Sequence, residues 1–375
     1  MRIAVITSTR ADWGLLSPIA RELRLAGHDM RIIAANMHFC GELGNTWREI
    51  EADGFEISNR IQPGNSPAMT AAATLAGVAD ALDALKPDAV LLLGDRYEIL
   101  AAAQAAVLSR IPIIHIAGGA VSEGAFDDSF RHAITKLSDL HLVETDEYRR
   151  RVIQLGENPD NVITTGAIGL HNLLSIETID LAALEESLGF EIGNDCLLAT
   201  FHPATLSPIP PEEQMHNFIE ALEASSHRII FTYPNNDSDP TPLIAQIEAF
   251  AARCSDRVKA VPSLGMKRYA AALHHVAAVV GNSSSGIVEA PSAGIPTLDI
   301  GIRQKGRTRA ASVVHCGDSA DEIAIGLQRI FSPEARAIAA RRENPYYRPD
   351  TLQKICDAID SFVHKPHLLK HFYDL

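Results

Sequence analysis

The chain has 375 residues, which exceeds one typical domain and favours two domains of about 170 residues each. Lys and Arg number 33 against 47 Asp and Glu, and the resulting net charge of −14 disfavours a general nucleic-acid-binding surface. An anionic ligand must therefore meet a local cluster of arginines. The composition, 46% hydrophobic and 21% charged, is that of a folded globular protein.

We expect neither a membrane span nor a secretion signal. The longest clean apolar runs, such as 89–93, are far shorter than the roughly 20 residues of a membrane span. The N-terminus enters a strand-like run without an apolar signal segment, which predicts a cytoplasmic protein. The cysteines are far apart and form no C-x-x-C, so we expect reduced thiols and no structural zinc site. They are Cys40, Cys196, Cys254, Cys316 and Cys356.

In the first half of the chain, short β-rich runs alternate with segments of helical periodicity, which is typical of parallel βαβ units. The predicted strands are 3–7, 30–34, 89–93, 111–116, 140–143 and 162–165. The predicted helices between them include 18–26, 70–85, 98–109 and 147–155.

The second half repeats the pattern, so the sequence predicts an α/β fold with two Rossmann-like, doubly wound domains. The predicted strands are 196–200, 228–232, 258–261, 277–280, 297–300 and 312–314. The domains are predicted to span 1–168 and 169–349, with a hinge at 167–172 and a C-terminal helix within 350–375 that packs back on the first domain or on the second. Parallel sheets bind ligands beyond the carboxyl ends of their strands, which predicts a ligand in a cleft between the domains.

Two strand ends in the first half carry arginine. The first strand ends in TSTRADWG, where Arg10 and the amides of a strand-to-helix turn suit a phosphate, although a solvated loop arginine fits as well. The run AVLLLGDRYE places Asp95 and Arg96 after a buried strand. Asp95 is equally suited to cap the helix that follows.

The segment HIAGGAVSEGAFDDSFRHAITKLS has the densest polar content. Its glycines allow close backbone approach to a ligand, and its paired carboxylates suit proton abstraction and return. An alternative makes an aspartate the helix N-cap and the arginine a solvated ion-pair partner. The polar residues are His115, Glu123, Asp127, Asp128, Arg131 and His132.

The second half offers residues that suit a diphosphate. His202 follows a strand in FHPAT, and Asn235 follows another in YPNND, although both are also compatible with ordinary loops. The run GNSSSGIVEA places Ser283 and Ser284 at a turn before a short helix, an anion cradle, with Glu289 positioned for sugar hydroxyls. Downstream, GIRQKGRTR supplies the positive charge through Arg303, Arg307 and Arg309.

No cofactor or metal is expected. His367 and His371 are spaced i,i+4, but no acidic residue completes a zinc motif there.

Together these motifs give the chain a recognisable likeness. From TSTRADWG, GDRYE, HIAGG, DDSFRHAITKLS, FHPAT and YPNND to GNSSSGIVEA and GIRQKGR, it resembles the hydrolysing UDP-N-acetylglucosamine 2-epimerases of sialic and related nonulosonic acid biosynthesis. The resemblance covers nearly the whole chain and implies the glycosyltransferase-B architecture. It also implies a UDP-sugar substrate, a UDP product and a homodimer or homotetramer.

The resemblance implies an elimination followed by a hydration. UDP leaves C1 as the C2 proton is removed, and water then adds to the 2-acetamidoglucal, giving free N-acetylmannosamine. It makes Asp95 and Asp127 the acid/base pair, oriented by Arg131, and it places His202 near the phosphates. The expected substrate-binding residues are Arg10, Arg96, His115, Asn235, Ser283, Ser284, Glu289, Arg303 and Arg307.

Two features depart from relatives or extend beyond them. Some relatives have a glutamate where this chain has Ala117, and we hypothesise that Glu123 supplies the missing carboxylate. We also hypothesise that 62–68, rich in Pro and Gly, is a mobile lid.

Other functions remain open at this point. They are a hydrolysing epimerase of UDP-2,4-diacetamido-trideoxyglucose or of a GDP-linked sugar in legionaminic acid biosynthesis, a non-hydrolysing epimerase, a glycosyltransferase of the same architecture, and a sugar-nucleotide sensor.

Overall fold

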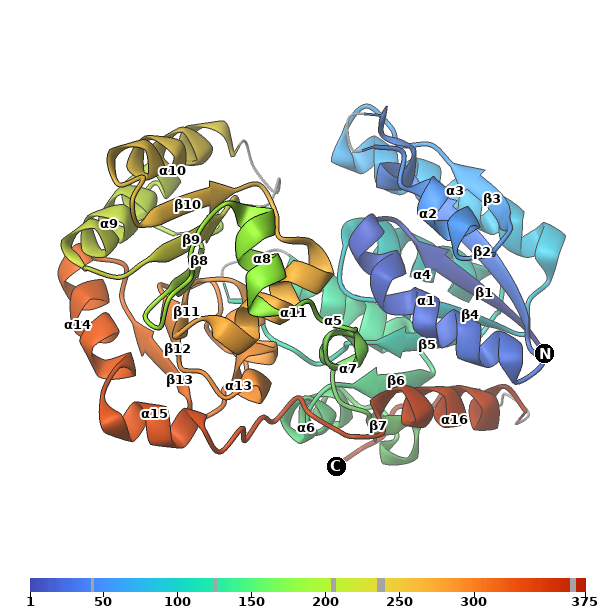
Figure 1. The fold of residues 1–375 in the computed structure, drawn as a ribbon. Coiled ribbons are helices and arrows are strands. Elements are labelled where there is room, and N and C mark those ends of the chain that lie inside the picture. Colours follow the sequence, from blue (N-terminus) through green and yellow to red (C-terminus); the bar gives the residue numbers. More distant parts are fainter. Residues whose placement is uncertain (42–43, 124–126, 204–206, 235–239, 365–368) are drawn as a thin grey trace. The chain divides into compact units, whose positions relative to one another are not determined.

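The computed structural model describes residues 1–41, 44–123, 127–203, 207–234, 240–364 and 369–375 (Figure 1). The chain forms two compact units. Unit 1 comprises Met1–Ala120, Phe126–Asn172 and Arg348–Leu375, and unit 2 comprises Val121–Ala125 and Leu173–Tyr347. The C-terminal segment thus belongs to unit 1.

Unit 1 is built on a parallel sheet of seven strands in the order β3-β2-β1-β4-β5-β6-β7. Along β1, Ile3 and Val5 face one side of the sheet, and Ala4 and Ile6 face the other, because side chains alternate along a strand. The strands are β1 Arg2–Thr7, β2 Asp29–Ala35, β3 Ile57–Ile61, β4 Ala89–Leu93, β5 Ile113–Ile116, β6 Leu140–Val143 and β7 Val162–Thr164.

Helices cover both faces of this sheet. One face packs against α1 Arg10–Leu25, α2 Trp47–Ala52 and α16 Thr351–Val363. The other packs against α3 Pro67–Leu85, α4 Tyr97–Leu108 and α5 Asp127–Leu137. The remaining helical segments up to the second sheet are η1 Asn36–Phe39, α6 Asp146–Gln154, η3 Pro159–Asn161, α7 Ile168–Ser175 and α8 Leu181–Leu188.

Unit 2 repeats this arrangement with six parallel strands in the order β10-β9-β8-β11-β12-β13. These strands are β8 Leu197–Thr200, β9 Ile229–Thr232, β10 Val258–Val261, β11 Ala278–Gly281, β12 Thr297–Ile300 and β13 Val313–Cys316. One face packs against α9 Pro211–Ala224, α10 Thr241–Arg253 and α14 Ala320–Ile330. The other packs against α8, α11 Gly265–His275 and α13 Ala290–Ala293; the short helices α12 Ser284–Val288 and α15 Pro333–Ala339 complete the unit.

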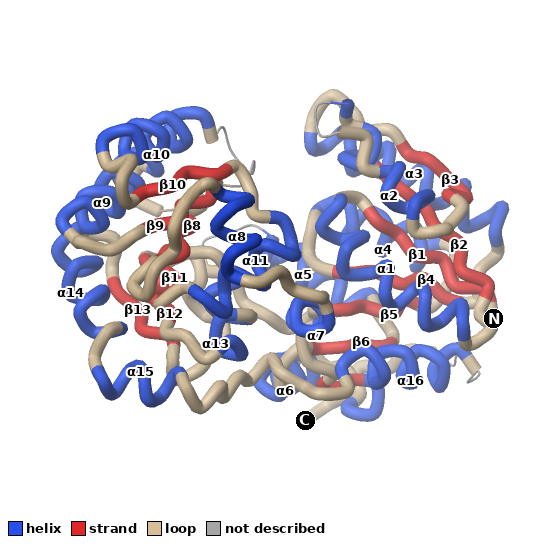
Figure 2. The backbone as a smooth tube through the Cα atoms, in the orientation of Figure 1, coloured by secondary structure: helices blue, strands red, loops and turns tan. Residues whose placement is uncertain are grey.

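The predicted fold class, α/β with two doubly wound Rossmann-like parts, is therefore confirmed. Within each unit, a helical segment joins most successive strands, whereas β13 follows β12 without one; Figure 2 colours the helices and strands separately. Parallel pairing in each sheet brings the carboxyl ends of its strands to one edge, and that edge is where the predicted site residues of each unit must be sought.

The structure differs from the sequence prediction at two elements. The edge strand β3 was not predicted, because its Asn59 and Arg60 interrupt the apolar pattern. Helix α1 begins at Arg10, not at residue 18, because Thr9 and Asp12 form a capping box and Pro18 is accommodated inside the helix.

The structure gives the local conformation of three further segments named in the sequence analysis. The predicted hinge is largely helix α7. In the predicted lid, Pro67 and Ala68 form the first turn of α3, and the Gly64 N–H donates to Thr70 Oγ1 at 3.0 Å. Finally, α3 is long and apolar enough to cross a membrane by length and composition, although here it is the crossover between β3 and β4 and packs on the sheet.

Candidate functional site

The carboxyl edge of unit 1 contains a buried arginine bound to two carboxylates. Arg131 on α5 is 2% exposed and forms an ion pair with Asp95, which follows β4. Its Nη1 also donates to Asp128 Oδ1 at 3.2 Å and to the Ala120 carbonyl at 3.0 Å. Because a buried charge is stable only when it is paired and hydrogen-bonded, Arg131 fixes the positions of both carboxylates.

This geometry excludes the interpretation of Asp95 as the helix cap. The N-cap residue of α4 is Arg96, and no side chain makes the cap hydrogen bond. Asp95 instead directs its carboxylate to Arg131, and its side chain remains 29% exposed. Asp127 is the first residue of α5, directly precedes Asp128 in the sequence, and is half-buried. The edge therefore presents accessible carboxylates on an ordered support, which is what proton transfer requires.

The other predicted residues of this edge occupy different environments. Arg10 is largely exposed and pairs with Glu49 Oε1 at 2.9 Å. Arg96 Nη2 lies 3.1 Å from Oε1 of the buried Glu98. His115 lies in β5 and is fully buried.

Asp12, which was not singled out from the sequence, is a buried carboxylate in the first turn of α1, which follows β1. Its Oδ2 accepts from Ser8 N, Ser8 Oγ and Thr9 N at 3.1, 2.8 and 3.0 Å. Burial raises its pKa, against the opposing effect of the Ser8 hydrogen bonds. The capping-box spacing from Thr9 was the available signal, and it indicates a structural role in shaping the turn that carries Arg10.

In unit 2, Asn282 joins three strand ends, and sequence reasoning missed its role. Its side chain accepts from His202 N at 2.7 Å and donates to His202 O at 2.8 Å, which fixes the turn after β8. Its carbonyl accepts from Arg303 Nη1 at 3.2 Å and from Gln304 Nε2 at 2.9 Å, beyond β12. The preceding Gly281 has φ +129, and a Cβ there would lie 1.9 Å from the Thr200 carbonyl, so only glycine fits.

The serine turn and the arginines lie in the segments that Asn282 joins. Ser283 is the N-cap of α12 and accepts from Ser285 N at 3.4 Å, and Ser284 begins that helix. Arg307 Nε has no hydrogen-bond partner in the part of the chain that the structure describes. Arg309, in contrast, pairs with the buried Asp299 at 2.8 Å and so stabilises the loop.

Burial and a neighbouring cation determine the charge of His202. Burial and, to a smaller extent, the positive charge of Arg303 together lower its pKa to about 3. The imidazole is therefore neutral at physiological pH and can donate a single ring hydrogen.

The remaining predicted residues of unit 2 are distributed as follows. Glu289 lies between α12 and α13, and its charge adds to the effect of burial in raising the pKa of Tyr269. Glu123 is exposed and pairs with Lys305 Nζ at 2.8 Å. Asn235 lies outside the described residues. No group of three or more metal-ligating side chains occurs among the described residues.

Known proteins resemble the chain over most of its length. The model of the UDP-N-acetylglucosamine 2-epimerase family matches residues 21–360. A GDP/UDP-N,N'-diacetylbacillosamine 2-epimerase (hydrolyzing) from Campylobacter jejuni is 32% identical over 84% of this chain and 83% of its own. Polysialic acid biosynthesis protein P7 from Escherichia coli is 32% identical over 100% of this chain and 97% of its own.

Solved structures of UDP-GlcNAc 2-epimerases have a similar fold. The UDP-GlcNAc 2-epimerase from Neisseria meningitidis, solved bound to UDP-GlcNAc, matches with a TM-score of 0.81 and 19% identity, over 96% of this chain and 100% of that one. Fold and sequence together define a sugar-nucleotide epimerase. The chain belongs to the UDP-N-acetylglucosamine 2-epimerase family.

Proposed function

We propose that the protein is a hydrolysing UDP-N-acetylglucosamine 2-epimerase, which converts UDP-N-acetylglucosamine and water into UDP and N-acetylmannosamine. The observation that carries the proposal is the buried Arg131, which holds Asp95 and Asp128 at the carboxyl edge of unit 1. A 2-epimerase must move a proton at C2, and ordered carboxylates are suited to that step.

Departure of UDP begins the reaction. The C2 hydrogen is not next to a carbonyl, so cleavage of the bond between C1 and the phosphate oxygen must lead, and charge develops on the diphosphate. Cations and hydrogen-bond donors that receive this charge lower the barrier. Arg10, Arg303, the Ser283–Ser284 turn and the neutral His202 ring are the proposed donors. Arg96 and Arg307 extend this group.

The two carboxylates then exchange protons with C2. Asp95 and Asp127 are the proposed acid/base pair: one removes the C2 proton as UDP leaves, which yields 2-acetamidoglucal. Water adds at C1, its proton passes to a carboxylate, and C2 receives a proton on the opposite face. The bond to UDP is thereby replaced by a bond to water oxygen, and C2 is inverted.

The remaining assignments concern recognition. Glu289 and Asn235 are proposed to bind the nucleotide, Glu289 through the ribose hydroxyls. Glu123 is proposed as a third carboxylate near C2. We further infer that the enzyme works in the cytoplasm, needs no metal ion and forms a homodimer or a homotetramer.

The name of a relative favours a second substrate. The C. jejuni protein is named for GDP- or UDP-linked N,N'-diacetylbacillosamine, a 2,4-diacetamido sugar, and it is 32% identical to this chain. Comparing turnover of UDP-N-acetylglucosamine with that of UDP- and GDP-linked diacetamido sugars decides between the substrates.

The deciding experiment uses purified protein with UDP-N-acetylglucosamine in deuterated water. The proposal predicts free UDP and N-acetylmannosamine with deuterium at C2. UDP-N-acetylmannosamine with the nucleotide still attached identifies a non-hydrolysing epimerase. Absence of any product from the donor alone leaves a glycosyltransferase or a sensor, and unlabelled N-acetylmannosamine refutes the mechanism.

A further inference from the structure

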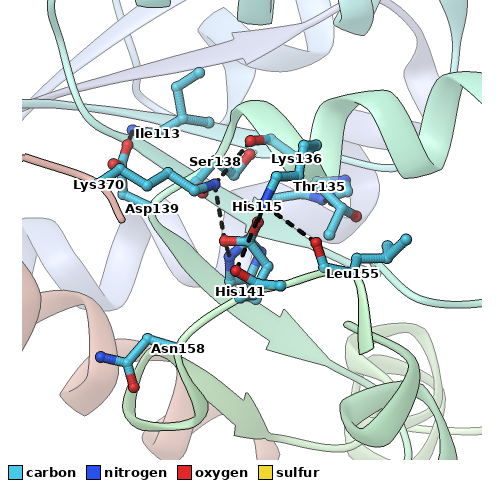
Figure 3. Close-up of polar contacts among 12 residues, drawn as sticks. Ile113, His115, Thr135, Lys136, Ser138, Asp139, His141, Leu155, Asn158 and Lys370 are labelled. Carbon is cyan, nitrogen blue, oxygen red and sulfur yellow. Dashed lines mark hydrogen bonds and ion pairs between the residues drawn. The ribbon is translucent and has the colours of Figure 1, made fainter. Parts of the chain in front are cut away.

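His115 in β5 contacts both elements that carry the Asp95–Arg131 ion pair. Its Nε2 lies 2.8 Å from the carbonyl oxygen of Gly94, the residue before Asp95. Its Nδ1 lies 3.4 Å from Oγ1 of Thr135, one turn beyond Arg131 on α5. Figure 3 shows His115 next to Thr135. The side chain thus links the turn after β4 to α5.

The hydrogen-bond pattern specifies one form of the His115 ring. A carbonyl oxygen can only accept, so Nε2 must carry the hydrogen and donate it to Gly94. Nδ1 is then the acceptor for the hydroxyl hydrogen of Thr135. The ring is 0% exposed, and this burial lowers its pKa to about 4, so the neutral form that the pattern requires is present at physiological pH.

The backbone conformation of the turn after β4, which contains Gly94, is tightly constrained. Gly94 has φ +85, a left-handed conformation that favours glycine, and its N–H donates to the Ile116 carbonyl at 3.1 Å. The His115 hydrogen bond fixes the carbonyl of the same residue. Both polar groups of Gly94 are therefore bound to β5, and the next residue, Asp95, leaves the turn toward Arg131.

We propose that His115 is a positioning residue that aligns the Asp95 carboxylate with Arg131, rather than a residue that contacts the substrate. This proposal rests on the proposed function, in which Asp95 exchanges a proton with the sugar. Reaction rates are sensitive to such alignment, because a displacement of about 1 Å at a reacting group can slow the chemical step by about 100-fold.

The neighbouring strand provides a matched control. His141 in β6 pairs with His115 in the strand register and is also buried. Its Nε2 lies 2.9 Å from Glu157 Oε2 and not from the turn after β4. Replacing either histidine by leucine removes a buried imidazole from the same sheet, but only the change at residue 115 releases Gly94.

The experiment compares His115→Leu, His115→Gln and His141→Leu in the full-length protein. For His115→Leu we expect kcat to fall about 10- to 100-fold while KM changes by less than about threefold. The amide of His115→Gln reaches the Nε2 position and donates to Gly94, so it should restore at least half of that loss on a logarithmic scale. His141→Leu should lower the melting temperature but leave kcat within about twofold.

Equal kcat losses in the two leucine variants, or an unchanged kcat in His115→Leu, would overturn the positioning role. If His115→Leu does not fold, His115→Asn replaces it, because its shorter amide cannot reach Gly94; a kcat equal to that of His115→Gln then refutes the proposal. Crystal structures of the variants test the proposal without measuring turnover. The ion pair between Asp95 and Arg131 should be lost only in the variants that lack the hydrogen bond to the Gly94 carbonyl. If the wild-type protein is inactive on every sugar nucleotide, the proposed epimerase function is wrong. The proposal that His115 aligns Asp95 with Arg131 is then judged by the crystal structures alone.

Discussion

The carboxyl edges of the two sheets rest on the same frame but carry different chemistry. Both sheets have the strand order 3-2-1-4-5-6 when strands are counted from the start of each unit, and unit 1 adds β7. In unit 1 the edge is organised by ions, with Arg131 between Asp95 and Asp128. In unit 2 it is organised by a neutral amide, Asn282, which fastens the loops that carry His202 and Arg303.

The difference shows that the doubly wound fold determines where a site lies, whereas the residues at the strand ends determine its chemistry. Carboxylates suit proton transfer, whereas serine hydroxyls, backbone amides and arginine suit a phosphate. The proposed reaction needs both, because proton transfer at C2 accompanies departure of a diphosphate. Variants of the unit 1 carboxylates Asp95 and Asp127 and variants of the unit 2 phosphate donors should therefore fail in different measurements.

The largest effect is expected for Asp95→Asn. Loss of a proton-transferring group should lower kcat by about 100- to 10,000-fold, while UDP binding measured by calorimetry changes by less than about twofold. Asp146→Asn is the control, because Asp146 begins the helix that follows β6 but forms only an exposed ion pair with Arg348. A large rise in the UDP dissociation constant of Asp95→Asn would contradict the division between the edges.

The reciprocal change is Arg303→Met in unit 2. Hydrogen bonds from a charged donor contribute about 1.5 to 3 kcal/mol, so the UDP dissociation constant should rise about 10- to 100-fold. Arg253→Met is the control, because Arg253 pairs with Glu223 on an exposed surface of the same unit. Unchanged UDP binding in Arg303→Met would remove this arginine from the diphosphate site.

A smaller effect is expected for Glu123→Gln, which tests the third carboxylate. Glu123 is exposed and paired with Lys305, so we expect kcat to fall about 10-fold, below the usual 100-fold or more for a proton-transferring group. Glu147→Gln, which removes an exposed carboxylate paired with Arg151, should have no effect on turnover. Turnover of Glu123→Gln equal to wild type would show that Glu123 does not replace the carboxylate absent at Ala117.

Local sequence patterns were sufficient for much of the fold. Strand β4 was predicted with its observed bounds, because a run of five buried apolar residues is bounded by Asp88 and Gly94. Edge strand β3 lacks such a run and was not predicted. Helix α1 was predicted to begin at Pro18, because proline is common in the first turn, but the helix begins at the preceding capping box. These errors arise where a local signal competes with tertiary packing.

The position of several candidate site residues after strands was predictable from the sequence. Asp95, His202 and Ser283 were selected because each follows a strand, and in parallel sheets that position lies at the ligand-binding edge. The clamp from Asn282 to His202 spans 80 residues of sequence, and the contact from His115 to Gly94 spans 21. No local pattern contains such partners, so the sequence did not reveal the hydrogen bonds from Asn282 to His202 or the contact from His115 to Gly94.

The smallest effect concerns a second ionic cluster in unit 1, formed around the buried Glu157. Its carboxylate lies 2.7 Å from Lys136 Nζ, 2.9 Å from His141 Nε2 and 2.8 Å from Nζ of the C-terminal Lys370. Burial alone would raise the pKa of Glu157, but the hydrogen bonds from His141, Lys136 and Lys370 outweigh it and lower the pKa to about 2. Lys370→Met should therefore destabilise the protein by about 1 to 2 kcal/mol near pH 7, measured by urea unfolding.

The pH dependence distinguishes this cluster from ordinary packing. Because the folded-state pKa of Glu157 is below its ordinary value of 4.5, the stabilisation is complete above pH 4.5 and is lost as the pH falls toward 2. The difference between wild type and Lys370→Met should therefore narrow below pH 4.5. Lys354→Met, which removes an exposed i,i+4 pair with Asp350, should change stability by less than about 0.5 kcal/mol at every pH. A deficit in Lys370→Met that stays constant to pH 2 would mean that the lysine acts through its aliphatic chain and not through the charge on Glu157.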